Sequence, residues 1–438
     1  MVAVRSRPSR RSAAVRALIA GGAFAVVLLA ACASPSVAPA SPAASSPTPT
    51  SSVSSPLVTP TAVPSPSEGD PLAQMSLEQK VGQLFMVGVP LDGSDDLVGA
   101  EIRDRHVGSV FLHGRSTAGV DPVSDLVADL AALVDPQSTA GIPLWIATDQ
   151  EGGEVQVLRG PGFDDIPYAI RQADRDTARL SRSARSWGDQ LRAAGVTMNL
   201  APVADIVTSH ATRFDNAPIG ALGRQYGYGE RTVAAKAGAF ADGMRAAGVL
   251  PTFKHFPGLG RVTQNTDTTA DVHDTEIGAD SPDVDVYREL LASGPAVVMV
   301  SNAIYDRIDA TRPAVFSPVV VRQVLRGDVG FAGVVMSDDL SDAVAVTGIA
   351  PADRALRALD AGVDLLLVAD DARVLPPMYD AVLARAQSDP DFAALVDEAA
   401  RRVVEAKAVR RAPPSGSSPA TRCPPRFSFI LPPPSVRW

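Results

Sequence analysis

Cysteine and histidine are scarce in the 438-residue sequence. Its 2 Cys cannot form a disulfide framework or a cysteine-rich metal site. Its 5 His include no HExxH pair and no evident ligand cluster, so a zinc site is not expected. The composition therefore excludes the disulfide-stapled and zinc-dependent classes of protein.

Several features of other protein classes are also missing. Lys and Arg total 40 against 49 Asp and Glu, a net charge of −9, whereas nucleic-acid-binding proteins usually carry a basic excess. No Walker-type loop and no G-x-G-x-x-G follows a predicted strand, and no G-x-S-x-G is present. We therefore expect no metal, no cofactor, no nucleic-acid partner and no serine nucleophile of that type.

The first 31 residues have the composition of an export signal. Five arginines and no acid occupy residues 1–16, an apolar run fills residues 17–31, and the run ends in Leu-Ala-Ala-Cys at Cys32. This ending resembles a bacterial lipobox, in which the cysteine becomes the first residue and carries the lipid. We predict a signal peptide over residues 1–31 and an extracytoplasmic lipoprotein, anchored through Cys32 on the outer face of the cytoplasmic membrane. An ordinary signal peptide or a single membrane anchor is the alternative, although the run is short for a span.

The segments on either side of the central part of the chain are rich in proline and serine. Residues 32–70 carry no charge before Glu68, and this composition favours an extended, disordered tether. Residues 412–438 include Cys423 and a short apolar run at residues 427–431. We expect a disordered tail there and assign no role to Cys423 or to the run.

The central part, residues 71–411, alternates short apolar runs with helical patterns. Most runs are continuously apolar, as strands buried on both faces should be. Several helical stretches end in a glycine just before the next run, as at Gly195, Gly248 and Gly362. Eight such units favour an α/β fold with a single (β/α)8 barrel over an open doubly wound sheet. The predicted strands are residues 83–89, 108–113, 143–148, 196–201, 250–254, 296–301, 333–337 and 364–369.

Polar residues occupy the ends of these predicted strands, where a barrel of this kind carries its chemistry. Asp149 follows the third strand, Lys254 and His255 end the fifth, and Asp338 follows the seventh. Two carboxylates across a cleft are the usual apparatus for glycoside cleavage, in which one attacks the anomeric carbon and an acid protonates the leaving oxygen. The other polar groups would hold sugar hydroxyls.

Four motifs resemble those of a known family. The stretch Lys-His-Phe-Pro-Gly that begins at Lys254 resembles the KHFPG signature of family 3 glycoside hydrolases. Asp-Gln-Glu-Gly-Gly from Asp149, Ala-Pro-Val-Ala-Asp up to Asp205 and Ser-Asp-Asp-Leu around Asp338 resemble three further motifs, in family order over about residues 72–408. Within the family, the sequence is most similar to single-domain bacterial β-N-acetylglucosaminidases of the cell-wall recycling type.

The resemblance implies a role for each residue that matches a family motif. Asp338 matches the nucleophile that forms a covalent glycosyl-enzyme, and the neighbouring Asp339 would cap or orient. Asp149 matches the acid that holds sugar hydroxyls at the innermost subsite. Three further residues match groups that contact the sugar: Arg224, Lys254 and His255.

The sequence departs from the family pattern at two motif positions. Val157 stands where the family has a second arginine that contacts the substrate, and Arg159 is a nearby substitute. Leu259 replaces a histidine that often follows the KHFPG motif.

The third departure concerns the acid/base. Enzymes of the cell-wall recycling type carry Asp-Ser-His on a mobile loop after KHFPG, and its histidine is the acid/base. The corresponding positions here are Asn265, Thr266 and Asp267. A carboxyl group can protonate a leaving oxygen when burial raises its pKa, so Asp267 is the candidate acid/base. His273, which would need a shifted loop, is the alternative, and a loop without any acid/base is the third.

Two functions are consistent with these residues. The first is a retaining glycosidase that removes terminal non-reducing β-linked sugars, with N-acetylglucosamine from peptidoglycan fragments as the best candidate. The second is a surface lipoprotein, catalytically weak or inactive, that binds sugar, because the sugar-holding residues are present and the acid/base histidine is not. We expect a monomer in either case.

Overall fold

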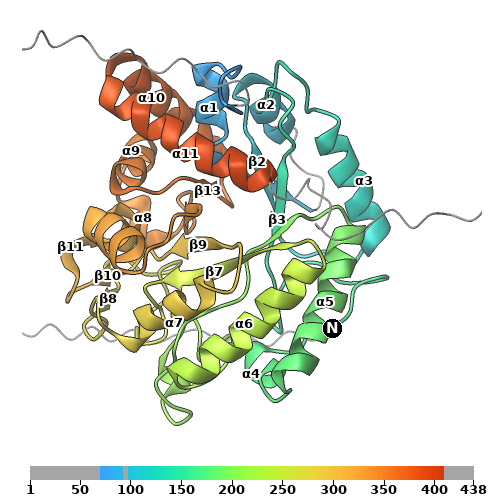
Figure 1. Ribbon diagram of the computed structural model, residues 1–438, viewed down its shortest axis with the longest axis vertical. Helices are drawn as coiled ribbons and strands as arrows, with labels where there is room; N and C mark the ends of the chain where they lie inside the picture. The colour runs from blue at the N-terminus through green and yellow to red at the C-terminus, as the bar shows by residue number, and fades with distance from the viewer. Residues whose placement is uncertain (1–69, 92–96, 409–438) are drawn as a thin grey trace, which may run out of the picture. The chain divides into compact units, whose positions relative to one another are not determined.

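The computed structural model describes residues 70–91 and 97–408, which contain a ring of parallel strands surrounded by helices (Figure 1). The predicted signal peptide, Cys32, the tether up to residue 69 and the tail with Cys423 lie outside the described residues, so they remain predictions. No helix in the described part of the chain is both long and apolar enough to cross a membrane.

The eight barrel strands coincide with the eight apolar runs that the sequence predicts. They pair in the order β12-β9-β7-β6-β3-β2-β1-β13, and every pair is parallel. A parallel bridge between Met336 and Leu365 closes the ring. The prediction of a (β/α)8 barrel is confirmed. The strands are β1 (Phe85–Pro90), β2 (Ser109–His113), β3 (Trp145–Thr148), β6 (Met198–Asn199), β7 (Leu250–Phe256), β9 (Val297–Val300), β12 (Val335–Ser337) and β13 (Leu366–Val368).

Helical segments follow the barrel strands in turn and cover the outside of the ring (Figure 1). After β9, this covering segment is the π-helical η3 (Val319–Asp328) rather than an α-helix. The α-helices are α1 (Leu77–Gly82), α2 (Leu97–Asp104), α3 (Val120–Ala131), α4 (Ala169–Gln172), α5 (Thr177–Ala193), α6 (Glu230–Ala246), α7 (Pro282–Leu291), α8 (Val344–Thr347), α9 (Pro351–Ala361), α10 (Leu375–Ser388) and α11 (Pro390–Ala408).

The alternation of side chains along each strand divides the apolar residues into two cores. Phe85 and Val87 of β1 pack outward in the core between strands and helices, whereas Met86 belongs to the core inside the ring. Val403 of α11 joins the inner core, so this helix packs over one end of the ring. The barrel interior is therefore filled by side chains rather than open, as in other barrels of this class.

Two small sheets lie outside the barrel and were not predicted. The first is a hairpin of β4 (Gln150–Gly152) and β5 (Val155–Gln156), directly after β3. The second joins β8 (His273–Asp274), β10 (Ile304–Tyr305) and β11 (Asp309–Pro313). Their strands have two to five residues, too few for a periodic pattern in the sequence.

A buried carboxylate reinforces the closure of the ring. Asp364, just before β13, is 1% exposed, and it accepts hydrogen bonds from Arg326 at 2.6 Å, from Arg402 at 2.9 Å and from the Val335 amide at 2.8 Å. Burial raises the pKa of Asp364, and the two arginines oppose this shift without reversing it. This one side chain therefore connects η3, α11 and β12.

We expect the loss of Asp364 to destabilise the fold far more than the loss of an exposed ion pair. Asp364→Ala leaves the two arginines without their carboxylate, and it should lower the free energy of unfolding by about 3–5 kcal/mol. Asp360→Ala is the control, because Asp360 pairs with Arg385 at 2.8 Å near the surface and should cost at most about 1 kcal/mol. Urea unfolding at pH 7 measures both, and equal losses would contradict the role of Asp364.

Candidate active site

A cavity of about 550 Å³ opens at the carboxyl ends of the barrel strands. The barrel brings together residues that are nearly 200 positions apart in the sequence. All six side chains predicted to bind or react with the sugar line this cavity: Asp149, Arg224, Lys254, His255, Asp267 and Asp338.

Lys254 lies at the centre of a buried ion network. Its Nζ is 2.6 Å from Oδ1 of Asp149, just after β3, and 2.8 Å from Oε1 of Glu151 in β4. Burial alone would lower the pKa of Lys254, but the two carboxylates outweigh burial and the pKa is raised. The lysine is therefore a permanent cation on the cavity wall, fixed in direction by two anions.

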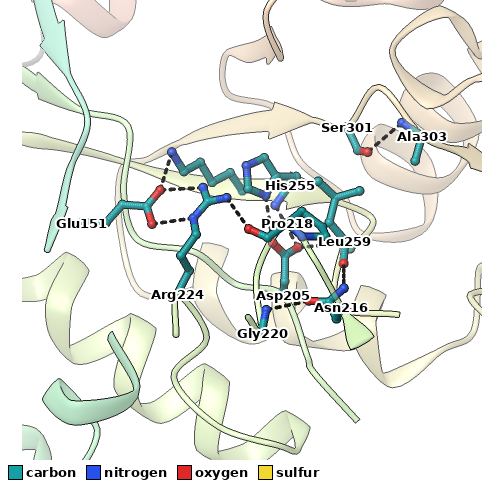
Figure 2. A network of polar contacts seen from close by, with 12 residues as sticks. Glu151, Asp205, Asn216, Pro218, Gly220, Arg224, His255, Leu259, Ser301 and Ala303 are labelled. Atoms are coloured by element: carbon teal, nitrogen blue, oxygen red, sulfur yellow. Dashed lines mark hydrogen bonds and ion pairs between the residues drawn. The ribbon is translucent and has the colours of Figure 1, made fainter. Parts of the chain in front are cut away.

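Glu151 in turn holds Arg224 through two parallel hydrogen bonds (Figure 2). The Glu151 oxygens accept from Nε at 2.9 Å and from Nη2 at 2.7 Å, and Nη1 donates to the Pro218 carbonyl at 2.9 Å. Burial works to raise the pKa of Glu151, yet Arg224 and Lys254 outweigh it and lower the pKa to about 2. A guanidinium has five N–H groups, so two remain for a ligand.

His255 is oriented by the buried carboxylate of Asp205 (Figure 2). Its Nδ1 lies 2.8 Å from Asp205 Oδ2, while Oδ1 accepts from the backbone amides of His255 at 3.0 Å and Leu259 at 2.9 Å. This contact keeps a proton on Nδ1 and leaves Nε2 as the other ring nitrogen for a ligand. Leu259, which stands in place of the family's histidine, lines the cavity and supplies one of the amides.

Asp338 follows β12 and is partly buried at the cavity wall. Its Oδ1 accepts a hydrogen bond from the Asp339 amide at 2.9 Å. Burial raises the pKa of Asp338 to about 6; the charge of Asp267 adds to this shift and His255 opposes it. A carboxylate that is poorly solvated in this way is a stronger nucleophile than one in water.

The carboxylate of the next residue, Asp339, is taken up by hydrogen bonds that orient the loop. Its carboxylate accepts hydrogen bonds from the Ser341 amide and hydroxyl and from the amides of Asp342 and Ala369, all between 2.7 and 2.9 Å. This agrees with the expectation that Asp339 caps or orients.

Asp342 is a carboxylate of the cavity that the sequence analysis missed. It is exposed and lines the cavity with Asp338. Although the side chain is exposed overall, partial desolvation, followed by the charges of Asp339 and Asp370, raises the pKa of Asp342 to about 6. Within the described residues, Asp338, Asp339 and Asp342 therefore line the cavity without an ion-pair partner, whereas Asp370 lies 3.1 Å from His113.

Asp267 lies on the loop after β7, and backbone contacts fasten this loop to the segment that follows Asp338. The Val344 amide donates to the Asp267 carbonyl at 3.2 Å, and the Ala345 amide donates to the Thr266 carbonyl at 3.0 Å. The Asp267 side chain lines the cavity but is exposed, so it lacks the burial that the sequence analysis expected of a carboxylic acid in this role. The loop that would carry the acid/base is thus held beside the residue that would carry the nucleophile.

Two other candidates lie away from the cavity lining. His273 is exposed on β8, and its Nδ1 is 2.6 Å from Asp306 Oδ1. Arg159, the suggested substitute for the missing arginine, bonds to the Gly153 carbonyl and to Asp165, both at 2.6 Å. Val157 does line the cavity, so an apolar side chain occupies this part of the wall.

A parallel barrel whose strands end in a cavity of carboxylates, one buried lysine and one oriented histidine is the arrangement of a barrel-type glycoside hydrolase. Over residues 76–406, the chain matches the family described as "Glycosyl hydrolase family 3 N terminal domain", and it belongs to that family. The resemblance drawn from the four motifs is confirmed. The protein is a glycosidase, and its substrate is a carbohydrate.

Known proteins similar to this chain include two hexosaminidases. The chain is 51% identical to a beta-N-acetylhexosaminidase of Beutenbergia cavernae, whose crystal structure matches 76% of this chain and 99% of that one with a TM-score of 0.76. It is 36% identical over 324 residues to the beta-hexosaminidase LpqI of Mycobacterium tuberculosis, a match that covers 70% of this chain and 78% of that protein. A family 3 beta-N-acetylglucosaminidase of Paenibacillus is 29% identical, with a TM-score of 0.68 over 79% of this chain and 65% of that one.

We expect Asp338→Asn to stabilise the fold at neutral pH. The pKa of Asp338 is about 6, above its ordinary value of 3.8, so from about pH 4 to 6 the folded chain keeps a proton that the unfolded chain releases. The wild type therefore loses stability relative to the variant as pH rises through this window. Thermal unfolding should show equal stability near pH 4 and an advantage of about 1–3 kcal/mol for the variant at pH 7.

Asp339→Asn is the matched control for this experiment. Its carboxylate accepts several hydrogen bonds, so the same substitution one residue later should destabilise the fold at pH 7. An Asp338→Asn protein that is less stable than the wild type at pH 7 would contradict the raised pKa of Asp338.

Proposed function

We propose that the protein is a retaining exo-glycosidase that removes terminal non-reducing β-linked N-acetylglucosamine. The observation that carries this proposal is the poorly solvated carboxylate of Asp338, in the same cavity as the fixed cation of Lys254 and the oriented ring of His255. The choice of sugar is supported by the two similar proteins, named beta-N-acetylhexosaminidase and beta-hexosaminidase.

In the first step, Asp149, Lys254, His255 and Arg224 hold the hydroxyls of the terminal sugar. The Asp338 carboxylate attacks the anomeric carbon, and the bond from this carbon to the leaving oxygen breaks. Asp267 gives its proton to that oxygen. The products are a free alcohol and a sugar ester of Asp338.

In the second step, water attacks the anomeric carbon of the ester. Asp267, now ionised, takes a proton from the water, and the bond to Asp338 breaks to release the sugar with its original β configuration.

The assignment of Asp267 as acid/base is supported by position. Its loop is held by backbone hydrogen bonds to the segment after Asp338, and its side chain lines the cavity. His273 is engaged with Asp306 instead. A carboxyl group here performs the task that a histidine performs in the family's cell-wall recycling enzymes.

Membership in a hydrolase family does not favour the alternative of a sugar-binding protein without turnover. We propose further that the substrate comes from peptidoglycan fragments and that the enzyme works as a monomer. We also propose that it is a lipoprotein held by Cys32 on the outer face of the cytoplasmic membrane. These proposals rest on the sequence motifs.

A leaving-group series tests the function and the acid together. Among 4-nitrophenyl β-glycosides, the N-acetylglucosaminide should be cleaved fastest. Asp267→Ala should lower kcat on a natural N-acetylglucosamine disaccharide by about 10²–10⁴-fold, because its alkoxide leaving group needs a proton. For glycosylation of the enzyme by the 4-nitrophenyl glycoside, the loss should be less than about tenfold, because nitrophenolate leaves without one. Burst and steady-state kinetics separate this step from ester hydrolysis.

Two variants control for simple disturbance of the site. His273→Ala should leave the rates on both substrates unchanged. Asp342→Asn removes a carboxyl group from the same cavity without removing the proposed acid. Equal losses on both substrates in Asp267→Ala would rule out Asp267 as the acid. A selective loss in His273→Ala or Asp342→Asn would transfer the role to that residue.

The pH dependence of the 4-nitrophenyl reaction should report Asp338, because this substrate does not need the acid. The nucleophile must be ionised, so kcat/KM should rise about tenfold per pH unit below about pH 6 and level off above it. A midpoint near pH 4 in the wild type would contradict this account.

A further inference from the structure

A second cavity, of about 1290 Å³, lies at the opposite end of the barrel. Its wall includes the first residues of three strands, Trp145 of β3, Leu250 of β7 and Val297 of β9, so it opens at the amino ends and away from the catalytic cavity. Other parts of the wall are also apolar, including Leu291 and Phe331. Nothing in the proposed reaction uses this cavity.

Two buried polar groups on its wall have incomplete partners. The indole N–H of Trp145 has no acceptor among the described residues, although the side chain is only 2% exposed. Lys407, 7% exposed, donates to Gln83 Oε1 and the Gly108 carbonyl, both at 2.7 Å. No carboxylate among the described residues forms an ion pair with it. A buried N–H without an acceptor costs free energy, so the cavity favours an occupant that brings oxygen acceptors as well as apolar surface.

A peptide offers both oxygen acceptors and apolar side chains, and the chain's own C-terminal segment begins at the edge of this cavity. Ala406 and Lys407 line the wall, and α11 ends at Ala408. The chain continues through residues 409–438, which include the otherwise unexplained run Phe-Ser-Phe-Ile-Leu at residues 427–431. We propose that the cavity at the amino end of the barrel binds this run of the chain's own C-terminal segment.

The distance allows such docking. Phe427 stands 19 residues beyond Ala408, and that many residues span up to about 60 Å when extended. Covalent attachment over so short a stretch also keeps the run near the cavity at an effective concentration on the order of millimolar. Binding therefore needs little intrinsic affinity.

The apolar parts of the wall suit an uncharged, apolar occupant. The run itself carries no charge, because its nearest arginine, Arg426, precedes it.

Photo-cross-linking from Cys423 tests the proposal in the full chain. Cys32→Ser leaves Cys423 as the only thiol, and a benzophenone maleimide attached there lies four residues before the run. Irradiation should give cross-links to the cavity wall, chiefly to residues 288–297 and 329–334. Replacing Phe427, Phe429, Ile430 and Leu431 by Ser should lower their yield about tenfold or more. Phe331→Ser on the wall should lower it as well.

Val436→Ser is the matched control, because it removes an apolar side chain from the same segment outside the run, and it should leave the yield unchanged. Both tail variants should keep full activity on 4-nitrophenyl N-acetyl-β-glucosaminide. Cross-links spread over the surface, or a yield that the four serines do not change, would overturn the proposal. In a mixture of ¹⁴N and ¹⁵N chains, cross-links between the two isotopic forms would overturn it in favour of a second copy.

Discussion

The catalytic cavity depends on the buried ammonium of Lys254 between Asp149 and Glu151. A lysine with a side chain 4% exposed is tolerable only because two carboxylates lie within 2.8 Å of it. Glu151 then fixes Arg224, so two cations and two anions form a neutral, rigid wall. Because these charged side chains are already fixed, they can hydrogen-bond neutral sugar hydroxyls without first being ordered by the ligand. The site is therefore preorganised for binding.

Other carboxylates of the same cavity are not paired in this way. Burial and the charge of Asp267 raise the pKa of Asp338 to about 6, and burial with the charges of Asp339 and Asp370 raises that of Asp342 to about 6. Poor solvation and charge repulsion of these carboxylates lower the stability of the fold, and they also make the Asp338 carboxylate more reactive. The fold tolerates this loss because the closed ring, with its inner and outer cores and the Asp364 junction, holds the loops on a rigid frame.

The sequence predicts the frame better than the contacts of the site. Eight apolar runs identify eight strands because a strand buried on both faces needs apolar residues throughout. Family motifs identify Asp338 and Lys254, since these residues lie inside long, specific patterns. The pairing of Glu151 with Arg224 was not predicted, because it joins residues 73 positions apart in a geometry that only the closed barrel sets.

Proximity in the sequence was a poor guide for substitutes. Arg159 is two residues from the position of the missing family arginine, yet β5 and the following turn direct it to its own loop and to Asp165. His273 lies six residues beyond Asp267, but it belongs to the small sheet of β8, β10 and β11. Short strands of this kind lack a periodic signal, and they nevertheless decide which polar side chains face the cavity.

The central claim is that Asp338 forms a covalent bond with the sugar, and trapping tests it most directly. A 5-fluoro-N-acetyl-β-glucosaminyl fluoride has a good leaving group, while its second fluorine slows hydrolysis of the ester. After incubation, peptide mass spectrometry should find one fluorinated sugar on the peptide that contains Asp338, located on that residue, and none in Asp338→Asn. A sugar attached to another carboxylate, or complete turnover by Asp338→Asn at the wild-type rate, would contradict the account.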